Sequence, residues 1–178
     1  SADASSISSL AEQAAAEGIT YMVSTGDSGA EGCDNPDTET RATGPVSVNI
    51  LASSPYTLGV GGTKFNENTN TAKYWSATNQ SDGGSALSYI PEDVWNESCL
   101  SGCGQSGGGA IWAGGGGAST LFSKPSWQSV VSGIPKDTHR DLPDVSLTAA
   151  AHDPYLLCFN FSCEQGFFNG VGGTSASA

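Results

Sequence analysis

The C-terminal stretch of the sequence carries its most reactive arrangement of residues. It reads Gly172-Gly173-Thr174-Ser175-Ala176-Ser177-Ala178, so small residues surround the hydroxyl of Ser175. Two glycines permit a tight turn, and the residues after them suit the first turn of a helix. A serine at a helix N-terminus lies beside unpaired backbone N–H groups, which favours a nucleophile whose reaction creates an oxyanion. The competing interpretation is an ordinary loop rich in serine and glycine.

A second candidate is Asp27, which lies in the sequence Gly26-Asp27-Ser28-Gly29. The apolar run 19–23 comes just before it, and in open α/β sheets ligand sites gather at the carboxyl ends of strands. The flanking glycines would let the backbone approach a substrate closely. The alternative is a turn in which the aspartate only contacts its own backbone.

Two elements must position Asp27. Apolar side chains recur at helical spacing within residues 5–17, at Ile7, Leu10, Ala11 and Ala14, and Gly18 is placed to end that helix. Residues 19–23 are predicted to form a strand buried on both faces. Because a helix leads directly into this strand, the pattern predicts a parallel sheet.

The later elements are predicted in outline. A second buried strand is expected in the latter half of residues 50–62, and a surface hairpin or loop over 64–84. A short helix is expected to begin within 123–128, with a strand beginning within 142–147. The glycine runs 107–109 and 114–117 lack the Gly-Lys-Ser/Thr ending of a phosphate loop, so we expect them to let chain segments pass close together.

The composition indicates one loop-rich α/β or β domain over residues 1–178. The chain has 24 glycines and a formal net charge of −12. Such an acidic chain is a poor partner for nucleic acid, and no apolar run is long enough to span a membrane. An acidic working environment is consistent with the charge, since protonation relieves self-repulsion. The chain begins without an initiator Met, which suggests a processed product or a piece of something longer.

The five cysteines suggest an oxidising, extracellular location. Cys99 and Cys103 form one close pair and Cys158 and Cys163 another, so two local disulfides are predicted. Zinc binding is the alternative, but the spacings fit it poorly and no histidine is near either pair. Cys33 has no obvious partner. Three Asn-x-Ser sequons, at Asn79, Asn96 and Asn160, are also compatible with secretion.

Several motifs in one order resemble a known family. They are Gly26-Asp27-Ser28-Gly29, Ser53-Ser54-Pro55-Tyr56, Val60-Gly61-Gly62-Thr63, Lys124-Pro125-Ser126-Trp127-Gln128, Pro143-Asp144-Val145-Ser146 and Gly173-Thr174-Ser175. Together they resemble the sedolisin family, the serine-carboxyl peptidases, and most closely its bacterial pro-kumamolisin-like members, through essentially the whole chain. The resemblance implies an α/β, subtilisin-like fold with a mainly parallel sheet flanked by helices, incomplete in this chain.

The resemblance also implies the roles of the two candidate residues. Ser175 matches the nucleophile and Asp27 the oxyanion-hole residue, where subtilisins have an asparagine. An ionised aspartate would repel the oxyanion, whereas a protonated one can donate a hydrogen bond to it. The implied protein is a secreted, acid-acting serine endopeptidase whose partner is a peptide or protein substrate.

The sequence departs from the family in two places. The family's general base is a Glu supported by an Asp one helical turn away, upstream of the Gly-Asp-Ser-Gly turn. Glu12 and Glu17 lie on the helix that leads directly into the first strand, so neither is assigned as the base. The calcium site implied by the resemblance is predicted beyond Ala178, so no metal ligand is assigned here. We therefore expect a partial catalytic domain that is inactive alone and has the remaining segments of the same domain as a possible partner.

Other functions fit the sequence less well. A Ser-His-Asp triad would use His139 or His152, but subtilisin-type order places the histidine far upstream of the nucleophile. Asp144 is expected to hold Arg140 or a backbone turn. A hydrolase of another fold would need a Gly-x-Ser-x-Gly elbow, which Ser175 lacks. The remaining alternative is a non-catalytic fragment or pseudoenzyme with a binding role.

Overall fold

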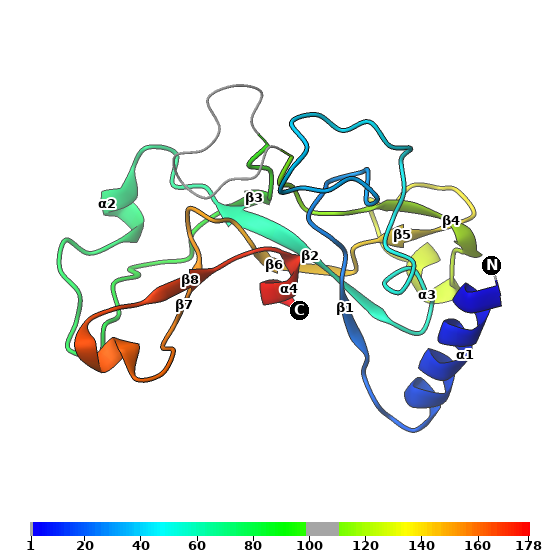
Figure 1. Cartoon of the computed structure of the whole chain (residues 1–178), viewed down its shortest axis with the longest axis horizontal. Coiled ribbons are helices and arrows are strands. Elements are labelled where there is room, and N and C mark those ends of the chain that lie inside the picture. The colour runs from blue at the N-terminus through cyan, green and yellow to red at the C-terminus, as the bar shows by residue number, and fades with distance from the viewer. Residues whose placement is uncertain (1, 99–110) are drawn as a thin grey trace.

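The computed structural model describes residues 2–98 and 111–178. They form an α/β fold, with helix α1 at one end, a twisted sheet through the middle and a two-stranded arm at the other end (Figure 1). The elements in chain order are α1 (Ala2–Ala16), β1 (Met22–Ser24), β2 (Leu58–Phe65), α2 (Thr71–Tyr74), β3 (Glu92–Val94), β4 (Gly117–Ser123), α3 (Ser126–Ser129), β5 (His139–Leu142), β6 (Val145–Thr148), β7 (Tyr155–Leu157), the 3-10 helix η1 (Ser162–Gln165), β8 (Asn169–Val171) and α4 (Thr174–Ser177).

Strand β2 is the centre of the main sheet. It pairs in parallel with β1 and with β6, and its C-terminal end pairs antiparallel with β3. Val60 pairs with both β1 and β6, and Thr63 pairs with both β3 and β6. Strands β1 and β3 therefore follow one another along the edge of β2 opposite β6. The prediction of a mainly parallel sheet is confirmed.

Two small hydrophobic clusters pack around this sheet. Val23, Ala52 and Leu142 form the first, and Trp95, Ala149 and Ala150 form the second, against which Trp112 also packs. The second cluster joins the segment after β3 to the segment after β6. Trp95 lies beside Gly62 within β2, and Ala149 and Ala150 follow the carboxyl end of β6. The cluster therefore supports the carboxyl-terminal side of the parallel strands, where a site is expected.

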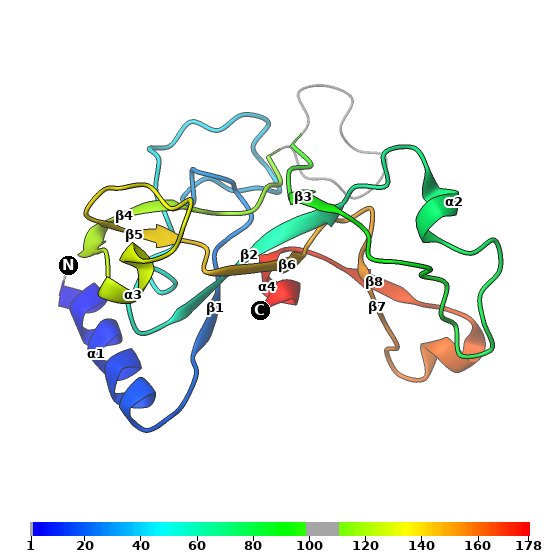
Figure 2. The ribbon, with the colours of Figure 1, turned by 180° about the vertical axis from the view of Figure 1, so that it is seen from behind.

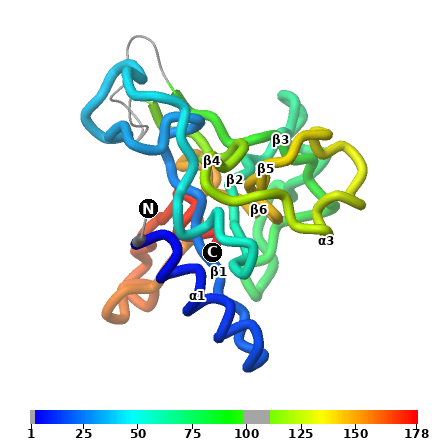
Figure 3. The backbone as a smooth tube through the Cα atoms, turned by 90° about the vertical axis from the view of Figure 1, so that its right-hand side faces the viewer, coloured from blue at the N-terminus to red at the C-terminus, as the bar shows by residue number. Residues whose placement is uncertain are grey.

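The short helix α4 packs on the three parallel strands. It contacts β1, β2 and β6, and the Ser177 hydroxyl donates hydrogen bonds to the carbonyl oxygens of Leu147 (3.2 Å) and Thr148 (2.8 Å) at the end of β6. Figure 3 shows the C-terminus beside β1, in the middle of the molecule. Residues that are 150 positions apart in the chain are thus held next to one another.

The first helix and strand differ in part from their predictions. The helix predicted over 5–17 spans Ala2–Ala16, and Leu10, placed on its apolar face, is 68% exposed. The strand predicted over 19–23 begins only at Met22, which is 51% exposed. The prediction of burial on both faces is wrong, because among the described strands β1 pairs only with β2, and only Val23 of β1 belongs to the core.

A buried ion pair fixes the turn between β5 and β6. Arg140 is fully buried, and its guanidinium contacts the Asp144 carboxylate at 2.6 Å and lies over the Trp127 ring. Asp144 also accepts a 2.7 Å hydrogen bond from the backbone N–H of Gly59 in β2. The expectation that Asp144 holds Arg140 is confirmed, and its backbone partner lies in a strand rather than in a turn, so this carboxylate has a structural function.

The remaining elements agree with the outline from the sequence. The second buried strand is β2, and the short helix after Pro125 is α3. In the region 64–84, β2 ends at Phe65 and the single-turn helix α2 is the next element. In the ribbon seen from behind, α2 and the arm formed by β7 and β8 lie at the end of the molecule opposite α1 (Figure 2). Within residues 2–98 and 111–178, no helix has the length and apolar character needed to cross a membrane.

Candidate active site

Ser175 lies in the first turn of α4, as the sequence predicted. The turn before it needs glycine: Gly173 has φ +86°, a backbone conformation that residues with a side chain rarely adopt. The Ser175 side chain is exposed, whereas its neighbour Thr174 is fully buried. Among the residues that the structure describes, the Ser175 hydroxyl has no hydrogen-bond partner. It is therefore accessible to a substrate and to a base.

The structure brings Asp27 to this same turn. Its Oδ1 atom accepts hydrogen bonds of 2.8 Å from both the backbone N–H and the hydroxyl of Thr174. The Thr174 hydroxyl in turn accepts a 3.0 Å hydrogen bond from the Gly26 N–H. A Cβ atom on Gly173 would lie only 2.7 Å from Asp27 Oδ2, so glycine at this position also makes room for the carboxylate. The two candidate residues, 148 positions apart, thus share one turn.

A second segment holds the backbone around Asp27. The N–H of Ala113 donates to the Asp27 carbonyl at 2.9 Å, and the N–H of Gly115 donates to the Gly26 carbonyl at 2.7 Å. A Cβ atom on Gly115 would lie 2.3 Å from the carbonyl oxygen of Thr25. This confirms that the glycine run 114–117 lets two segments pass close together, here at the site itself. The run 107–109 lies outside the described residues.

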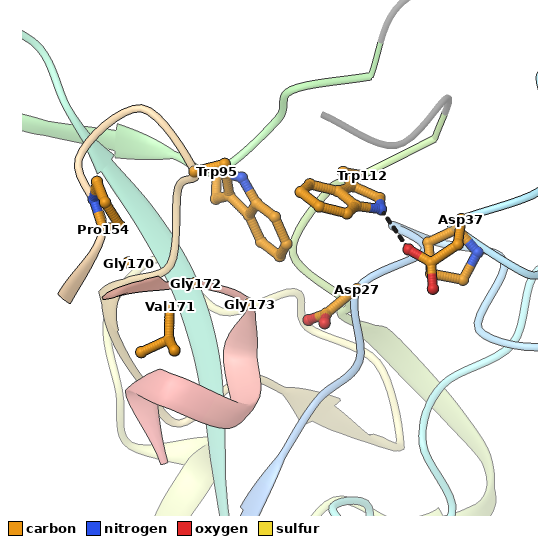
Figure 4. Close-up of a pocket in the computed structure, with 11 residues that line it drawn as sticks. Asp27, Asp37, Trp95, Trp112, Pro154, Gly170, Val171, Gly172 and Gly173 are labelled. Carbon is orange, nitrogen blue, oxygen red and sulfur yellow. Dashed lines mark hydrogen bonds between the residues drawn. The ribbon is translucent and has the colours of Figure 1, made fainter. Parts of the chain in front are cut away.

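A cavity of about 440 Å³ opens beside Asp27 and the glycine turn (Figure 4). Its walls come from the loop after Asp27, from two tryptophans and from the base of the β7–β8 arm. The lining residues are Asp27, Pro36, Asp37, Trp95, Trp112, Ala151, Pro154, Gly170, Val171, Gly172 and Gly173. The lining residue Gly173 is two positions before Ser175 in the chain.

Glu97 joins two residues that line this cavity, Trp95 and Ala151. Its Oε2 accepts hydrogen bonds from the Trp95 indole (2.9 Å) and the Ala151 N–H (2.7 Å), and its Oε1 accepts from the His152 N–H (3.1 Å) and contacts His152 Nδ1 (2.8 Å). Each carboxylate oxygen thus serves two groups. Trp95 and Ala151 both line the cavity, so Glu97 determines the distance between them.

The Glu97–His152 contact shifts both pKa values. Partial burial would raise the pKa of Glu97, but the hydrogen bonds from Ala151, Trp95 and His152 outweigh it and lower that pKa below its usual value. Burial would lower the pKa of His152, but the hydrogen bond and charge of Glu97 and the charge of Asp153 outweigh it and raise that pKa. Both shifts favour the charged pair.

The other acids and histidines considered from the sequence lie elsewhere. Glu12 accepts a 2.9 Å hydrogen bond from the Tyr56 hydroxyl, and Glu17 accepts one of 2.9 Å from Gln13, so both side chains serve α1 and its surroundings. His139 is exposed on β5, and His152 is paired with Glu97. The geometry gives no support to a Ser-His-Asp triad.

Three residues at the cavity were not singled out from the sequence: Asp37, Glu97 and Trp112. The Trp112 indole donates a 3.0 Å hydrogen bond to Asp37 Oδ1, across 75 positions of chain. Glu97 reaches Ala151 across 54 positions. Their neighbours in sequence form no recognisable motif, so only the folded chain shows that they meet.

The structure describes three of the five cysteines. Cys158 and Cys163 form a disulfide in the loop between β7 and β8, as predicted. Cys99 and Cys103 lie outside the described residues, so that pairing stays a prediction. Cys33 is a free, exposed thiol.

The described side chains do not form a metal centre. Within the described ranges, no group of three or more His, Cys, Asp or Glu side chains could hold a metal ion. These residues therefore do not fit the calcium implied by the resemblance, and calcium bound elsewhere in the protein stays a prediction.

Three known peptidases are similar to this chain over most of its length. No protein-family profile matches the chain. It is 40% identical over 168 residues to sedolisin from Pseudomonas sp. (strain 101), covering 93% of this chain and 23% of that protein. It is 33% identical to xanthomonalisin from Xanthomonas sp. (strain T-22) and 31% identical to kumamolisin from Bacillus sp. (strain MN-32), covering 94% and 93% of this chain and 19% and 24% of those proteins.

A solved structure shares the fold. Pseudomonas sedolisin, a serine-carboxyl proteinase complexed with two molecules of pseudo-iodotyrostatin, matches with a TM-score of 0.61 and 36% identity. The match covers 96% of this chain and 38% of that chain. The present chain thus spans about a quarter of the length of the curated relatives or less, and has the subtilisin-like α/β fold in part.

Proposed function

Because this chain is homologous to sedolisin-family peptidases over a segment of their length, we propose that it carries the nucleophile of a serine-carboxyl peptidase. One observation supports this most: Asp27 Oδ1 holds both the N–H and the hydroxyl of Thr174, directly before Ser175. A nucleophile on a turn that a carboxyl group holds by hydrogen bonds is an arrangement suited to acyl transfer. The reaction is hydrolysis of a peptide bond inside a protein or peptide chain.

The residues of the turn divide the chemistry between them. Ser175 Oγ attacks the peptide carbonyl carbon and gives its proton to a base, which forms a tetrahedral oxyanion. The N–H of Ser175 and a protonated Asp27 donate hydrogen bonds to that oxyanion. The amine then leaves with a proton, and water hydrolyses the acyl-enzyme. Because Asp27 Oδ1 is already the acceptor for Thr174, Oδ2 is the oxygen that carries the donated proton.

Acidic working conditions follow from this use of Asp27. A carboxyl group donates a hydrogen bond only when protonated, and carboxyl groups are protonated in acid. The base must accept a proton under the same conditions, which suits a Glu supported by an Asp, the pair implied by the family. No acid described here contacts Ser175, so we propose that a segment of the full-length protein outside this chain supplies that pair.

Secretion is part of the proposal. The disulfide between Cys158 and Cys163 is typical of oxidising compartments. The sequon asparagines Asn79, Asn96 and Asn160 are all exposed, so they are open to modification in a secretory pathway.

The test uses the protein expressed from its full coding sequence. Changing Ser175→Ala is expected to lower kcat/KM on a protein substrate at acidic pH by at least about 10⁴-fold, with the thermal unfolding midpoint nearly unchanged. The matched control is Ser132→Ala, which removes an exposed hydroxyl from a surface loop and should leave activity intact.

Two outcomes would contradict the assignment. Near-normal turnover by a folded Ser175→Ala protein would show that another residue is the nucleophile. A full-length protein that is folded but cleaves nothing would favour the alternative of a pseudoenzyme with a binding role.

A further inference from the structure

The cavity beside the glycine turn has an unusual combination of linings. Two acids, Asp27 and Asp37, and two indoles, Trp95 and Trp112, line it, and none of its described lining residues is basic. The rest of the wall is apolar or backbone. From this arrangement we propose that the cavity binds a lysine or arginine side chain of the peptide substrate, and that Asp37 determines this specificity. The inference rests on the proposed peptidase function and adds its substrate class.

Asp37 and Trp112 form a fixed pair at one end of the cavity. The Trp112 indole N–H donates to Asp37 Oδ1 at 3.0 Å, and the Asp37 N–H donates to Asn35 Oδ1 at 2.9 Å. These contacts hold the carboxylate against the edge of the indole, and Figure 4 shows both residues at the end of the cavity away from Pro154 and Val171. Oδ2 makes no hydrogen bond among the described residues, so it remains available to a ligand.

The chemistry of this end favours a cation over a neutral group. A guanidinium or ammonium group can pair with the carboxylate and lie against an indole face, and the two attractions add. A neutral side chain in the same place would remove water from the carboxylate without replacing its hydrogen bonds. An acidic side chain would be repelled by Asp37 and by the net charge of −12.

The shape of the cavity suits a long basic side chain. Trp95, Val171 and Pro154 supply an apolar wall, and Asp37 lies at the opposite end. Lysine and arginine place an aliphatic stem on apolar surface while the charged head reaches a polar group. The cavity of about 440 Å³ has room for such a stem beside the backbone of the glycine turn.

A control variant is needed to separate the effect of the Asp37 carboxylate from that of the overall negative charge of the chain. Asp82 is the matched control, because its Oδ1 also accepts a hydrogen bond, from the Gly84 N–H at 2.9 Å, and it lies in a different surface loop. Both Asp37→Asn and Asp82→Asn remove one negative charge while keeping an acceptor oxygen. Only Asp37→Asn removes a charge from the cavity.

The experiment measures kcat/KM of the full-length protein on a peptide series. Each position of one peptide in turn carries arginine, its neutral analogue citrulline, or glutamate, and the assays run at the highest pH that supports turnover. We expect arginine to exceed citrulline by about tenfold at one position. Asp37→Asn should bring that ratio close to one by slowing only the arginine peptide, and Asp82→Asn should leave it unchanged.

Two results would overturn the inference. One is an arginine-to-citrulline ratio near one at every position, and the other is a ratio that survives Asp37→Asn. If no peptide is cleaved, the proposed function fails, and calorimetric binding of the arginine and citrulline peptides to the Ser175→Ala protein decides the specificity separately. Equal binding of the two peptides would then overturn it.

Discussion

The turn at Ser175 and the Asp37 end of the cavity are built in different ways. The turn depends on backbone: a glycine with positive φ, a carboxylate that holds the next N–H, and a glycine run packed against Thr25. The Asp37 end depends on one side-chain contact between two loops. A backbone-built turn tolerates almost no change in geometry, whereas a contact between loop side chains can change without loss of the fold. We therefore expect the catalytic chemistry at the turn that carries Ser175 and the substrate specificity at the Asp37 end of the cavity.

Among changes that keep the Ser175 hydroxyl, the largest effect is expected from Gly173→Ala, which tests the turn at Ser175. The new Cβ would approach Asp27 Oδ2 to 2.7 Å and displace the carboxylate or the turn. Because a displacement of about 1 Å at a catalytic group can cost roughly 100-fold, we expect kcat/KM to fall by at least about 100-fold.

Gly133→Ala is the matched control for that change. Gly133 has φ +89°, close to that of Gly173, but a Cβ there would meet no atom within 4 Å. Both variants should lose about 1 kcal/mol of stability from backbone strain, measured by thermal unfolding. Equal loss of activity in the two would show that strain alone, and not contact with Asp27, explains the requirement for glycine.

A smaller effect is expected from Glu97→Gln, which loosens the cavity wall. An amide has one acceptor oxygen where the carboxylate has two, so one pair of donors among Trp95, Ala151 and His152 loses its partner. We expect KM for peptides to rise by about 5- to 10-fold with kcat little changed, because Ser175 and Asp27 are untouched. Glu92→Gln, an exposed change on β3, is the control and should leave KM unchanged. An equal change in kcat would place Glu97 in the chemistry.

The Glu97–His152 pair also predicts how the stability of the protein depends on pH. The lowered pKa of Glu97 means that its stabilisation is present above its usual pKa and is lost as pH falls through the lowered value. The raised pKa of His152 means that its stabilisation is present below its usual pKa and is lost as pH rises through the raised value. The destabilisation by Glu97→Gln should therefore be greatest between about pH 4.5 and 6.5. His152 is 45% exposed, so we expect an effect of at most about 1 kcal/mol.

The turn at Ser175 could be predicted from the sequence better than the Asp37 end of the cavity, for a physical reason. Ser175 and Asp27 lie in short stretches of small residues whose backbone requirements can be seen locally. The buried strand β2 was also predictable, because its first five residues, Leu58–Gly62, include no polar side chain. Asp37, Glu97 and Trp112 act through contacts across 54 to 75 positions, and no local pattern encodes such a contact. The exposure of Met22 was missed because an apolar run does not show that its strand lies at a sheet edge.

The central claim is that a protonated Asp27 serves Ser175, and the pH profile of Asp27→Asn tests it most directly. An asparagine donates a hydrogen bond without needing a proton, so the variant no longer depends on acid at this position. The measurement is kcat/KM against pH for the full-length enzyme and for Asp27→Asn. We predict a bell-shaped acidic profile for the enzyme, and for the variant a lower peak with an alkaline limb moved to higher pH. A variant that keeps its activity with an unchanged alkaline limb would contradict the claim and leave Asp27 as a turn residue only.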